Sequence, residues 1–553
     1  MAYDTTIVNN LHSDEIVEKE IPDCLQRDLL DSPYFPKLQR SVLIGIIALC
    51  VIFVLTSVNR LNHTDLWGHM NFGRWIVENQ SLPSADPFAL AATEAASERT
   101  FLNVPWLSQV LGYFVYQVMG AEGLVLAHAA IVTAACGVLM VAIRKREVNI
   151  YWAVAGGILA YILSLPVVGT IRPQLFGMLG AALVLLACVC MLTKRHPVFW
   201  LPVVFLLWAN LHGSFVIGLA MLGLAVLGIS WNVRKMAPNF QKTVYDSRFQ
   251  TAWTTLAICT VACCINPIGP RLILSVLSFG GNTVLSGISE WRAMSPMSFT
   301  GILFFASVAM LFGCMRYSAR KFELFDVLML ILFAVATFSS IRMLAWWALV
   351  LPFALAPHAE LAWQKLRDRE HAPEPADEVN GMATVIAMGF VFMTLLMAPP
   401  SQGLLSGRPR GITAVTATDT PIYLAAELNR RKIDAPIFSP MDWADYILWR
   451  NDGRMKPLVY SHVHLTDPET WNDYRELAIG SVDWYQITKK HGIKYVALSK
   501  SRNDSLAREV FLASQEDDPR VRVIYQDQQS ILAEVLDVPD MLEEIAATEE
   551  PAA

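Results

Sequence analysis

The chain has 553 residues, of which 54% are hydrophobic and 17% are charged, and its mean hydropathy is +0.40. This composition predicts a polytopic membrane protein. The net charge of -6 is small for this length, and the sequence offers no basic stripe that would neutralise phosphates. Nucleic acid is therefore excluded as a partner.

The N-terminal part of the chain predicts a tail followed by a membrane domain. Residues 1–38 are polar and lack the layout of a cleaved signal peptide, so they are expected to form a cytoplasmic tail. Residues 39–400 carry about eleven apolar runs, each near the length that crosses a bilayer. These runs are 41–58, 122–143, 150–169, 173–193, 197–211, 213–231, 251–267, 299–315, 323–340, 343–357 and 381–399.

Two further apolar stretches, residues 105–119 and 270–286, are short and interrupted by polar residues or glycine. We expect them to be surface or re-entrant helices. The large first outer loop then covers residues 60–121. With a cytoplasmic N-terminus, every compact basic cluster falls on the inner side, as the positive-inside rule requires. Counting 105–119 as a span would move the cluster at 144–146 outside.

This topology predicts that ionisable residues collect on one side of the membrane. Such groups at membrane depth usually face a cavity or a partner. The odd number of spans also sends the C-terminus to that side. The predicted outer residues are Asp65, His69, Asp86, Arg172, Asn210, His212, Glu290 and Arg342.

A soluble α/β domain is expected after the linker at residues 401–412. Residues 413–545 alternate helix-like stretches with strand-like runs, which favours a small sheet covered by helices. The expected helices are 421–431, 443–450, 468–479, 482–491 and 505–515, and the expected strands are 436–439, 457–460, 494–498, 521–525 and 530–536. The acidic tail at 546–553 is expected to be disordered.

Several short motifs carry a resemblance to a known family. The first outer loop reads D-L-W-G-H-M-N-F-G-R-W-I, then L-P-S-A-D-P-F and W-L-S-Q-V-L, and it is followed in order by R-P-Q-L-F-G, W-A-N-L-H-G-S-F, I-N-P-I-G and S-E-W. This ordered set resembles bacterial integral membrane glycosyltransferases of GT-C type. The resemblance implies a polytopic helical fold with an outer soluble domain, and transfer of a sugar from a polyprenyl-phosphate donor at the outer face.

The family commonly has one or two acidic residues in the first outer loop, as a catalytic base or metal ligand, and Asp65 matches that position. Many members carry an adjacent acidic pair, which Leu66 and Trp67 replace here. A divalent metal ion, Mg²⁺ or Mn²⁺, is thus left open, with Asp65 and His69 as its only candidate ligands. His69 follows Asp65 by four residues and shares its face of a helix. His69 could equally be a surface histidine of an interfacial helix.

Glycosyl transfer with inversion needs a base for the acceptor hydroxyl, and a carboxylate within hydrogen-bond reach can serve. We predict that Asp65 is this base; the alternative is a cap of the helix that begins near it. Asp86 is a second catalytic candidate, although the following proline also allows it to start a turn.

The leaving phosphate needs cationic stabilisation, and guanidinium groups suit bidentate phosphate recognition. Arg172 and Arg342 are the candidates, with snorkelling to lipid headgroups as the alternative. Asn210 and His212 are expected to line the same cavity, or to form a structural pair. Glu290 is expected to lie where a lipid donor enters, or to pair with a neighbouring arginine.

In the sheet domain the run P-M-D-W-A-D-Y carries Asp442, Trp443 and Asp445, which could contact an acceptor. Packing of Trp443 beneath the first strand is the simpler interpretation.

The sequence thus predicts a multi-pass glycosyltransferase of the cytoplasmic membrane. Its acceptor would be an envelope glycan, lipid or protein. Three alternatives stay open: a glycan ligase or polymerase, a transporter, and a non-catalytic envelope assembly protein. A transporter would place ionisable residues near the bilayer midplane, and a ligase usually relies on a large later loop.

Overall fold

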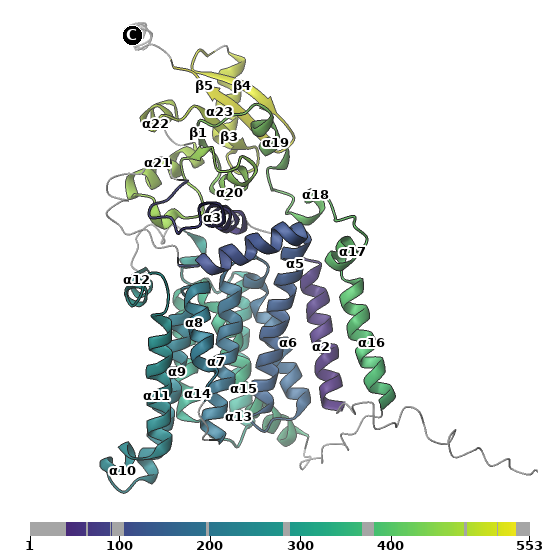
Figure 1. The fold of residues 1–553 in the computed structure, drawn as a ribbon, viewed down its shortest axis with the longest axis vertical. Coiled ribbons are helices and arrows are strands. Elements are labelled where there is room, and N and C mark those ends of the chain that lie inside the picture. Colours follow the sequence, from purple (N-terminus) through teal and green to yellow (C-terminus); the bar gives the residue numbers. More distant parts are fainter. Residues whose placement is uncertain are drawn as a thin grey trace, which may run out of the picture.

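The computed structural model describes residues 40–61, 65–88, 90, 104–194, 198–279, 288–367, 381–480, 484–516 and 518–537. The predicted tails at 1–38 and 546–553 and part of the first outer loop lie outside the described residues. Figure 1 shows a bundle of roughly parallel helices with a smaller helix-and-sheet unit at one end.

The bundle is built from helices that coincide with the predicted apolar runs. Their bounds are α2 Arg40–Ser57, α5 Trp106–Arg144, α6 Ile150–Val168, α7 Gln174–Lys194, α8 Leu201–Leu211, α9 Phe215–Met236, α11 Ser247–Cys263, α13 Phe299–Tyr317, α14 Leu324–Ser339, α15 Leu344–Leu366 and α16 Gly381–Met397. Shorter helices are α10 Phe240–Val244, α12 Arg271–Phe279, α17 Pro399–Leu405 and α18 Ile412–Val415.

Six helices among the described residues are long and apolar enough to cross a membrane, or seven if the bent pair formed by α16 and α17 is one span. The protein is therefore a multi-pass membrane protein. Three shorter apolar helices, including α8 and α14, fall below that length. The predicted count of about eleven spans is thus not confirmed, although each predicted run contains a helix.

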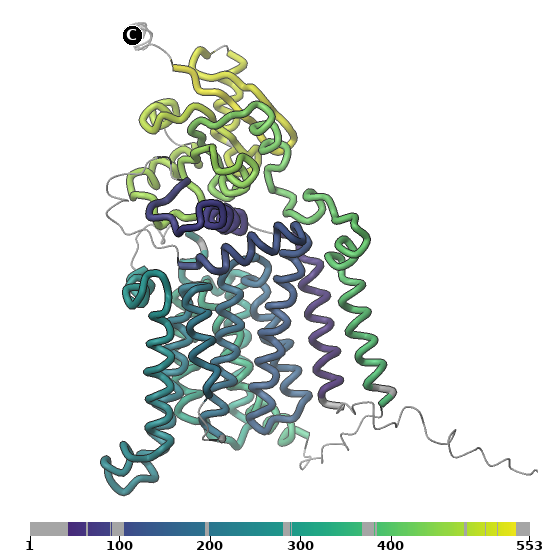
Figure 2. Tube along the Cα trace, viewed as in Figure 1, coloured from purple at the N-terminus to yellow at the C-terminus, as the bar shows by residue number. Residues whose placement is uncertain are grey.

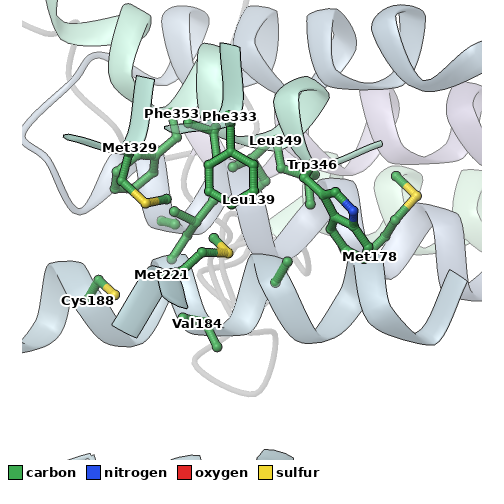
Figure 3. Close-up of a cluster of buried hydrophobic side chains, with 14 of the residues drawn as sticks. Leu139, Met178, Val184, Cys188, Met221, Met329, Phe333, Trp346, Leu349 and Phe353 are labelled. Carbon is green, nitrogen blue, oxygen red and sulfur yellow. The ribbon is translucent and has the colours of Figure 1, made fainter. Parts of the chain in front are cut away.

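Helix α15 forms the centre of the bundle. Every residue from Leu344 to His358 is buried, as expected for a helix that is apolar on all sides. Figure 3 shows its side chains meeting those of α5, α7, α9 and α14. The labelled contacts include Leu139, Met178, Met221, Phe333, Trp346 and Phe353. This packing fixes the start of α15, which follows Arg342 by two residues.

Helix α5 is broken at Gly120, whose backbone angles are φ 63° and ψ -158°. A residue with a side chain rarely adopts a positive φ of this kind. The first half of α5 lies across the end of the bundle, and the second half runs down into it (Figures 1 and 2). The predicted surface helix at 105–119 is this first half. The second predicted surface stretch contains α12 at Arg271–Phe279, and residues 280–287 lie outside the described part.

The C-terminal unit is a five-stranded mixed sheet in the order β2-β1-β3-β5-β4. Strands β2, β1 and β3 are parallel, whereas β5 is antiparallel to both β3 and β4. The strands are β1 Pro436–Phe438, β2 Lys456–Pro457, β3 Tyr495–Ser499, β4 Val521–Gln526 and β5 Ser530–Val535. Its helices are α19 Ile422–Arg430, α20 Met441–Arg450, α21 Pro468–Ile479, α22 Trp484–Lys490 and α23 Asp504–Gln515. Each expected element of this region has a counterpart, while its separation as an outer domain stays a prediction.

Helix α3, Asp65–Asn79, lies between the bundle and the sheet unit (Figure 1). Two glycines permit close packing on its two sides. A Cβ at Gly73 would stand 2.2 Å from the backbone oxygen of Gln109 in α5, and a Cβ at Gly68 would stand 2.6 Å from Asp445 in α20. No side chain fits in either space, so these glycines of the D-L-W-G-H-M-N-F-G motif allow α3 to contact both units directly.

Two further contacts attach the connecting segment to the bundle. Leu61 donates its backbone N–H to Val415, and Ala417 donates to Leu61. Glu122, at the start of the descending half of α5, is 1% exposed and accepts two hydrogen bonds of 2.6 Å from the Arg410 guanidinium. These contacts hold the sheet unit close to the end of the bundle that carries α3.

Candidate active site

Arg172 is the centre of an ionic cluster at the end of the bundle facing the sheet unit. It lies in the turn between α6 and α7, and its side chain is 11% exposed. Its Nε lies 2.9 Å from Asp65 Oδ2, and its terminal nitrogen lies 2.5 Å and 2.7 Å from the two oxygens of Glu290. Burial opposes the charge of Arg172, but the two carboxylates hold its pKa above the ordinary value. Arg172 is therefore a permanent cation shared by two anions.

Arg342 lies beside this cluster because hydrogen bonds join two short helical turns, one carrying Glu290 and the other carrying Arg342. Glu290 and Trp291 belong to η3 Ser289–Trp291, and Arg342 belongs to η4 Ile341–Met343. Ile341 donates its backbone N–H to Arg292, and Ser340 donates its hydroxyl to the backbone oxygen of Glu290. The guanidinium of Arg342 lies 5.1 Å from the centre of the Trp291 ring, a cation–π contact. Burial lowers the pKa of Arg342, and the charge of Arg172 lowers it further, so the two guanidinium groups interact electrostatically.

His69 lies one helical turn after Asp65, on the same side of α3. Its Nδ1 is 3.3 Å from Gln109 Nε2. Burial lowers the pKa of His69 to about 4; Asp65 raises it, while Arg172 and Arg342 lower it further. The ring is therefore neutral near pH 7, and because an amide NH₂ can only donate, Nδ1 is the acceptor. The proton of His69 then resides on Nε2.

His212 follows α8 and is also neutral. Burial lowers its pKa to about 3, with further lowering by Arg342 and His69. The backbone N–H of Ser214 donates to His212 Nδ1 at 3.1 Å, and the Ser214 hydroxyl lies 2.7 Å from the same nitrogen. Trp208 Nε1 donates to that hydroxyl. His212 therefore also carries its proton on Nε2, where it can donate to a ligand oxygen.

The sheet unit contributes side chains that were missed from the sequence. The run Y-S-H-V-H follows β2, and its two histidines lie at the carboxyl end of a parallel strand, where ligand sites of open α/β sheets form. The ring centres of His462 and His69 are 5.9 Å apart. Burial lowers the pKa of His464 to about 4, and electrostatic effects of Arg342 and His69 contribute to the lowering. Alternating histidines directly after a predicted strand were the available sequence signal.

Asp445 of α20 is fully buried and faces α3. Its Oδ1 accepts a hydrogen bond of 3.1 Å from Ser461, and among the described residues no hydrogen-bond partner is found for its Oδ2. Burial raises the pKa of Asp445 well above the ordinary value, and Asp65 raises it further. The run P-M-D-W-A-D-Y thus supplies a second carboxyl near the cluster. Trp443 is buried and packs with Ile437 of β1, as the simpler interpretation predicted.

An apolar groove with a volume of about 90 Å³ has Arg172 and His69 in its lining. It runs between α3, both halves of α5 and the start of α7. Its lining is aliphatic and aromatic apart from five polar side chains, which are His69, Ser108, Gln109, His128 and Arg172. The apolar lining residues are Leu66, Met70, Leu111, Val115, Leu124, Ile131, Ile171, Leu175 and Phe176. An arginine beside an apolar lining suits an amphiphilic ligand with an anionic head.

The fold has counterparts among solved structures. The arabinofuranosyltransferase AftD from Mycobacteria matches with a TM-score of 0.52 at 18% identity, over 91% of this chain and 40% of the AftD chain. The chain has the GT-C fold. A mutant form of AftD matches with a TM-score of 0.50 at 16% identity, over 91% of this chain and 42% of the other. ArnT from Cupriavidus metallidurans, in a structure bound to undecaprenyl phosphate, has a TM-score of 0.43 at 15% identity, over 89% of this chain and 97% of ArnT.

The likeness to the two AftD structures, at 18% and 16% identity, concerns the GT-C fold alone, and this chain spans less than half the length of AftD. No protein-family model and no curated protein matches the sequence. The residues themselves must therefore carry the functional argument.

Two of the predicted site residues, Asp86 and Asn210, form hydrogen bonds that have a structural role. Asp86 Oδ1 accepts from the backbone N–H of Phe88 at 2.9 Å, and its Oδ2 accepts from the Tyr460 hydroxyl at 2.5 Å. Asn210 accepts from Trp106 Nε1 at 2.9 Å and donates to the backbone oxygens of Leu206 and Ile265. Asp86 thus forms the turn that was its alternative interpretation, and Asn210 joins α8 to the start of α5.

The pair Asp65 and His69 does not fit a metal ion in this arrangement. The Asp65 carboxylate is paired with a guanidinium, which disfavours a second cation there, and the acceptor nitrogen of His69 faces an amide donor. Within the described residues, no group of three or more His, Cys, Asp or Glu side chains could hold a metal ion. No catalytic step is therefore derived through a metal.

Proposed function

We propose that the protein is an integral membrane glycosyltransferase that moves a sugar from a polyprenyl-phosphate donor to an envelope glycan, lipid or protein acceptor. The observation that carries this proposal is the apolar groove that has Arg172 in its lining. The first part of a polyprenyl chain would enter the groove, and its phosphate would meet the guanidinium groups of Arg172 and Arg342. AftD, which shares the fold, is itself a glycosyltransferase.

The two arginines would stabilise the leaving group. As the bond between the anomeric carbon and the phosphate oxygen breaks, the phosphate keeps the electron pair and gains negative charge. Arg172 keeps its charge because it is paired with Asp65 and Glu290. Glu290 would hold the Arg172 fork in place through its two contacts, so its role is positioning.

Asp65 would act as the base. The acceptor hydroxyl would transfer its proton to the carboxylate while its oxygen bonds to the anomeric carbon on the face opposite the phosphate, which inverts the configuration. The proton thus passes to Asp65, the sugar passes to the acceptor oxygen, and the phosphate leaves with the electron pair. The pairing of Asp65 with Arg172 brings base and leaving-group cation to one place, as a single-site transfer requires.

His69 and His212 would donate hydrogen bonds from Nε2 to phosphate or sugar oxygens, because each is neutral and holds its proton on that atom. Asp86 and Asn210 would act only by positioning the loops that carry the site. A divalent metal ion is not part of this proposal, because the arginines supply the positive charge.

The site is proposed to face the outer side of the cytoplasmic membrane, with the N-terminus cytoplasmic. The basic residues Arg144 and Arg234 lie in the last turns of α5 and α9, and Figure 1 shows these helix ends opposite the sheet unit. By the positive-inside rule, that end would be cytoplasmic. The sheet unit and the cluster around Arg172 would then be extracytoplasmic.

The test is complementation of a deletion strain with wild type and Asp65→Asn, with lipid-linked sugars and envelope glycans profiled by mass spectrometry. We expect the variant, at wild-type protein levels, to lose one glycan product and accumulate one lipid-linked sugar. Unchanged profiles in the deletion strain itself would refute a transferase and favour the non-catalytic assembly protein.

A further inference from the structure

A row of rings crosses the boundary between the sheet unit and the bundle. It starts at Tyr460, whose ring centre lies 5.4 Å from that of His462. His462 and His464 follow at 5.5 Å, His464 and Phe279 at 5.1 Å, and Phe279 and Trp291 at 5.8 Å. Each step is within the usual spacing of interacting rings.

The last four rings, His462, His464, Phe279 and Trp291, are half-buried and are called the ring strip below. They come from three separate parts of the chain: the segment after β2, the end of α12, and η3. Side chains that only filled a core would be covered on all sides, as Tyr460 is at 5% exposure. The four residues of the ring strip are therefore partly accessible to solvent, although Phe72 packs on His462 and Arg342 lies over Trp291.

Both ends of the ring strip meet the candidate active site. At one end His462 lies beside His69, with ring centres 5.9 Å apart, and His69 shares a face of α3 with Asp65. At the other end Trp291 lies under the Arg342 guanidinium. A molecule lying on the ring strip would thus reach the carboxylate proposed as the base and the cation proposed for the phosphate.

The ring strip is uncharged near pH 7. Burial lowers the pKa of His464 to about 4 and that of His462 well below its ordinary value. Neutral imidazoles offer one donor and one acceptor each, together with a flat face. An anionic group would prefer the neighbouring arginines, and an isoprenoid chain would prefer the aliphatic groove on the bundle side of α3. The ring strip suits a ligand with both hydroxyl groups and apolar C–H faces.

We propose that the ring strip binds the acceptor and that this acceptor is a neutral carbohydrate chain, whose sugar faces stack on the rings while its hydroxyl groups bond to the histidines. This inference rests on the proposed glycosyltransferase function and narrows its acceptor from glycan, lipid or protein to glycan. The spacing of several rings in a row suits a chain of sugars rather than a single one, because each ring can carry a separate contact.

The experiment measures carbohydrate binding directly. The full-length protein in nanodiscs is applied to an array of short linear oligosaccharides of neutral hexoses and pentoses. The variants are Phe279→Leu, which keeps apolar volume without a ring, Phe279→Tyr, which restores a ring, and His464→Ala. The matched control is Tyr245→Ala, which removes an exposed ring (72% exposed) from the segment between α10 and α11, far from the site.

We expect wild type to bind at least one oligosaccharide, Phe279→Leu and His464→Ala to bind about tenfold more weakly, and Phe279→Tyr and Tyr245→Ala to bind like wild type. Binding by wild type to none of the oligosaccharides, or equal binding by Phe279→Leu, would overturn the inference. Thermal unfolding of each variant identifies any that fail to fold, and the Phe279→Leu and Phe279→Tyr pair then decides.

Failure of the inference is distinguishable from failure of the proposed function. Turnover of polyprenyl-phosphate sugars extracted from the deletion strain is measured on wild type in the same nanodiscs. Turnover without ring-dependent binding overturns the ring strip alone. Ring-dependent binding without turnover supports the carbohydrate site and overturns the transferase.

Discussion

Replacing Asp65 by asparagine removes one negative charge beside Arg172 while keeping the size of the side chain. If Asp65 is the base, the loss of proton transfer lowers the rate by about 10²–10⁴-fold, which corresponds to roughly 3–5 kcal/mol of transition-state stabilisation. The effect on folding should be small. Asp65 is 28% exposed and gives Arg172 a contact of 2.9 Å, while Glu290 retains its contacts of 2.5 Å and 2.7 Å. The cost in stability is therefore about 1 kcal/mol.

The matched control is Glu290→Gln, which removes a charge from the same guanidinium. Glu290 is 33% exposed, close to the exposure of Asp65. If Glu290 only positions Arg172, the rate should fall far less than in Asp65→Asn. The assay is turnover of extracted polyprenyl-phosphate sugars by purified protein, with thermal unfolding measured in parallel. Equal losses in the two variants would refute the base and would make Asp65 a second positioning residue for Arg172.

Arg172→Lys should lower turnover by about 10²-fold because an ammonium group cannot reproduce the guanidinium fork. The control Arg248→Lys, at a distant ion pair with Asp246, should leave turnover unchanged. Equal turnover by the two variants would show that Arg172 does not stabilise the leaving group. Thermal stability should fall as the pH is lowered from about 6.5 to about 4. In the folded protein the pKa values of His69 and His464 are about 4, whereas histidine in the unfolded chain has a pKa near 6.5, so the unfolded chain binds more protons in this pH range. His464→Gln should flatten this fall, and an unchanged pH profile would contradict neutral burial. Glu122→Ala should destabilise the protein by about 2 kcal/mol, because it removes a buried ion pair whose remaining partner, the part-exposed Arg410, can still be hydrated. Residues 401–412 should then be cleaved more readily by protease. Protease resistance equal to that of wild type would show that other contacts hold this segment. Chelation should leave turnover within about twofold, and a loss restored by Mg²⁺ or Mn²⁺ would return a metal to the mechanism.

The sequence by itself determined the helical elements of the membrane part, because in a bilayer the backbone must satisfy its own hydrogen bonds and an apolar run therefore forms a helix. It also located the helices and strands of residues 421–536, whose periodicity and turn residues are local signals. The sequence also grouped the outer residues Asp65, Arg172 and Glu290, because the order of the helices places their loops at one end of the bundle. The count of spans, the orientation and the limits of the outer domain stay predictions.

The tertiary structure alone decided which of these residues meet. The pairing of Arg172 with both Asp65 and Glu290 depends on packing between η3, α3 and the turn before α7. The sequence left two interpretations open for Asp86 and for Asn210, and only the structure showed that the Tyr460 hydroxyl bonds to Asp86 and that Asn210 bonds to the backbone oxygen of Ile265. The contributions of Asp445, His462 and His464 could not be predicted, because they require α20 and the end of β2 to rest on α3 through the space left at Gly68. Such contacts join positions nearly four hundred residues apart, as Asn71 and Asp445 are at a separation of 374, and no local pattern encodes them.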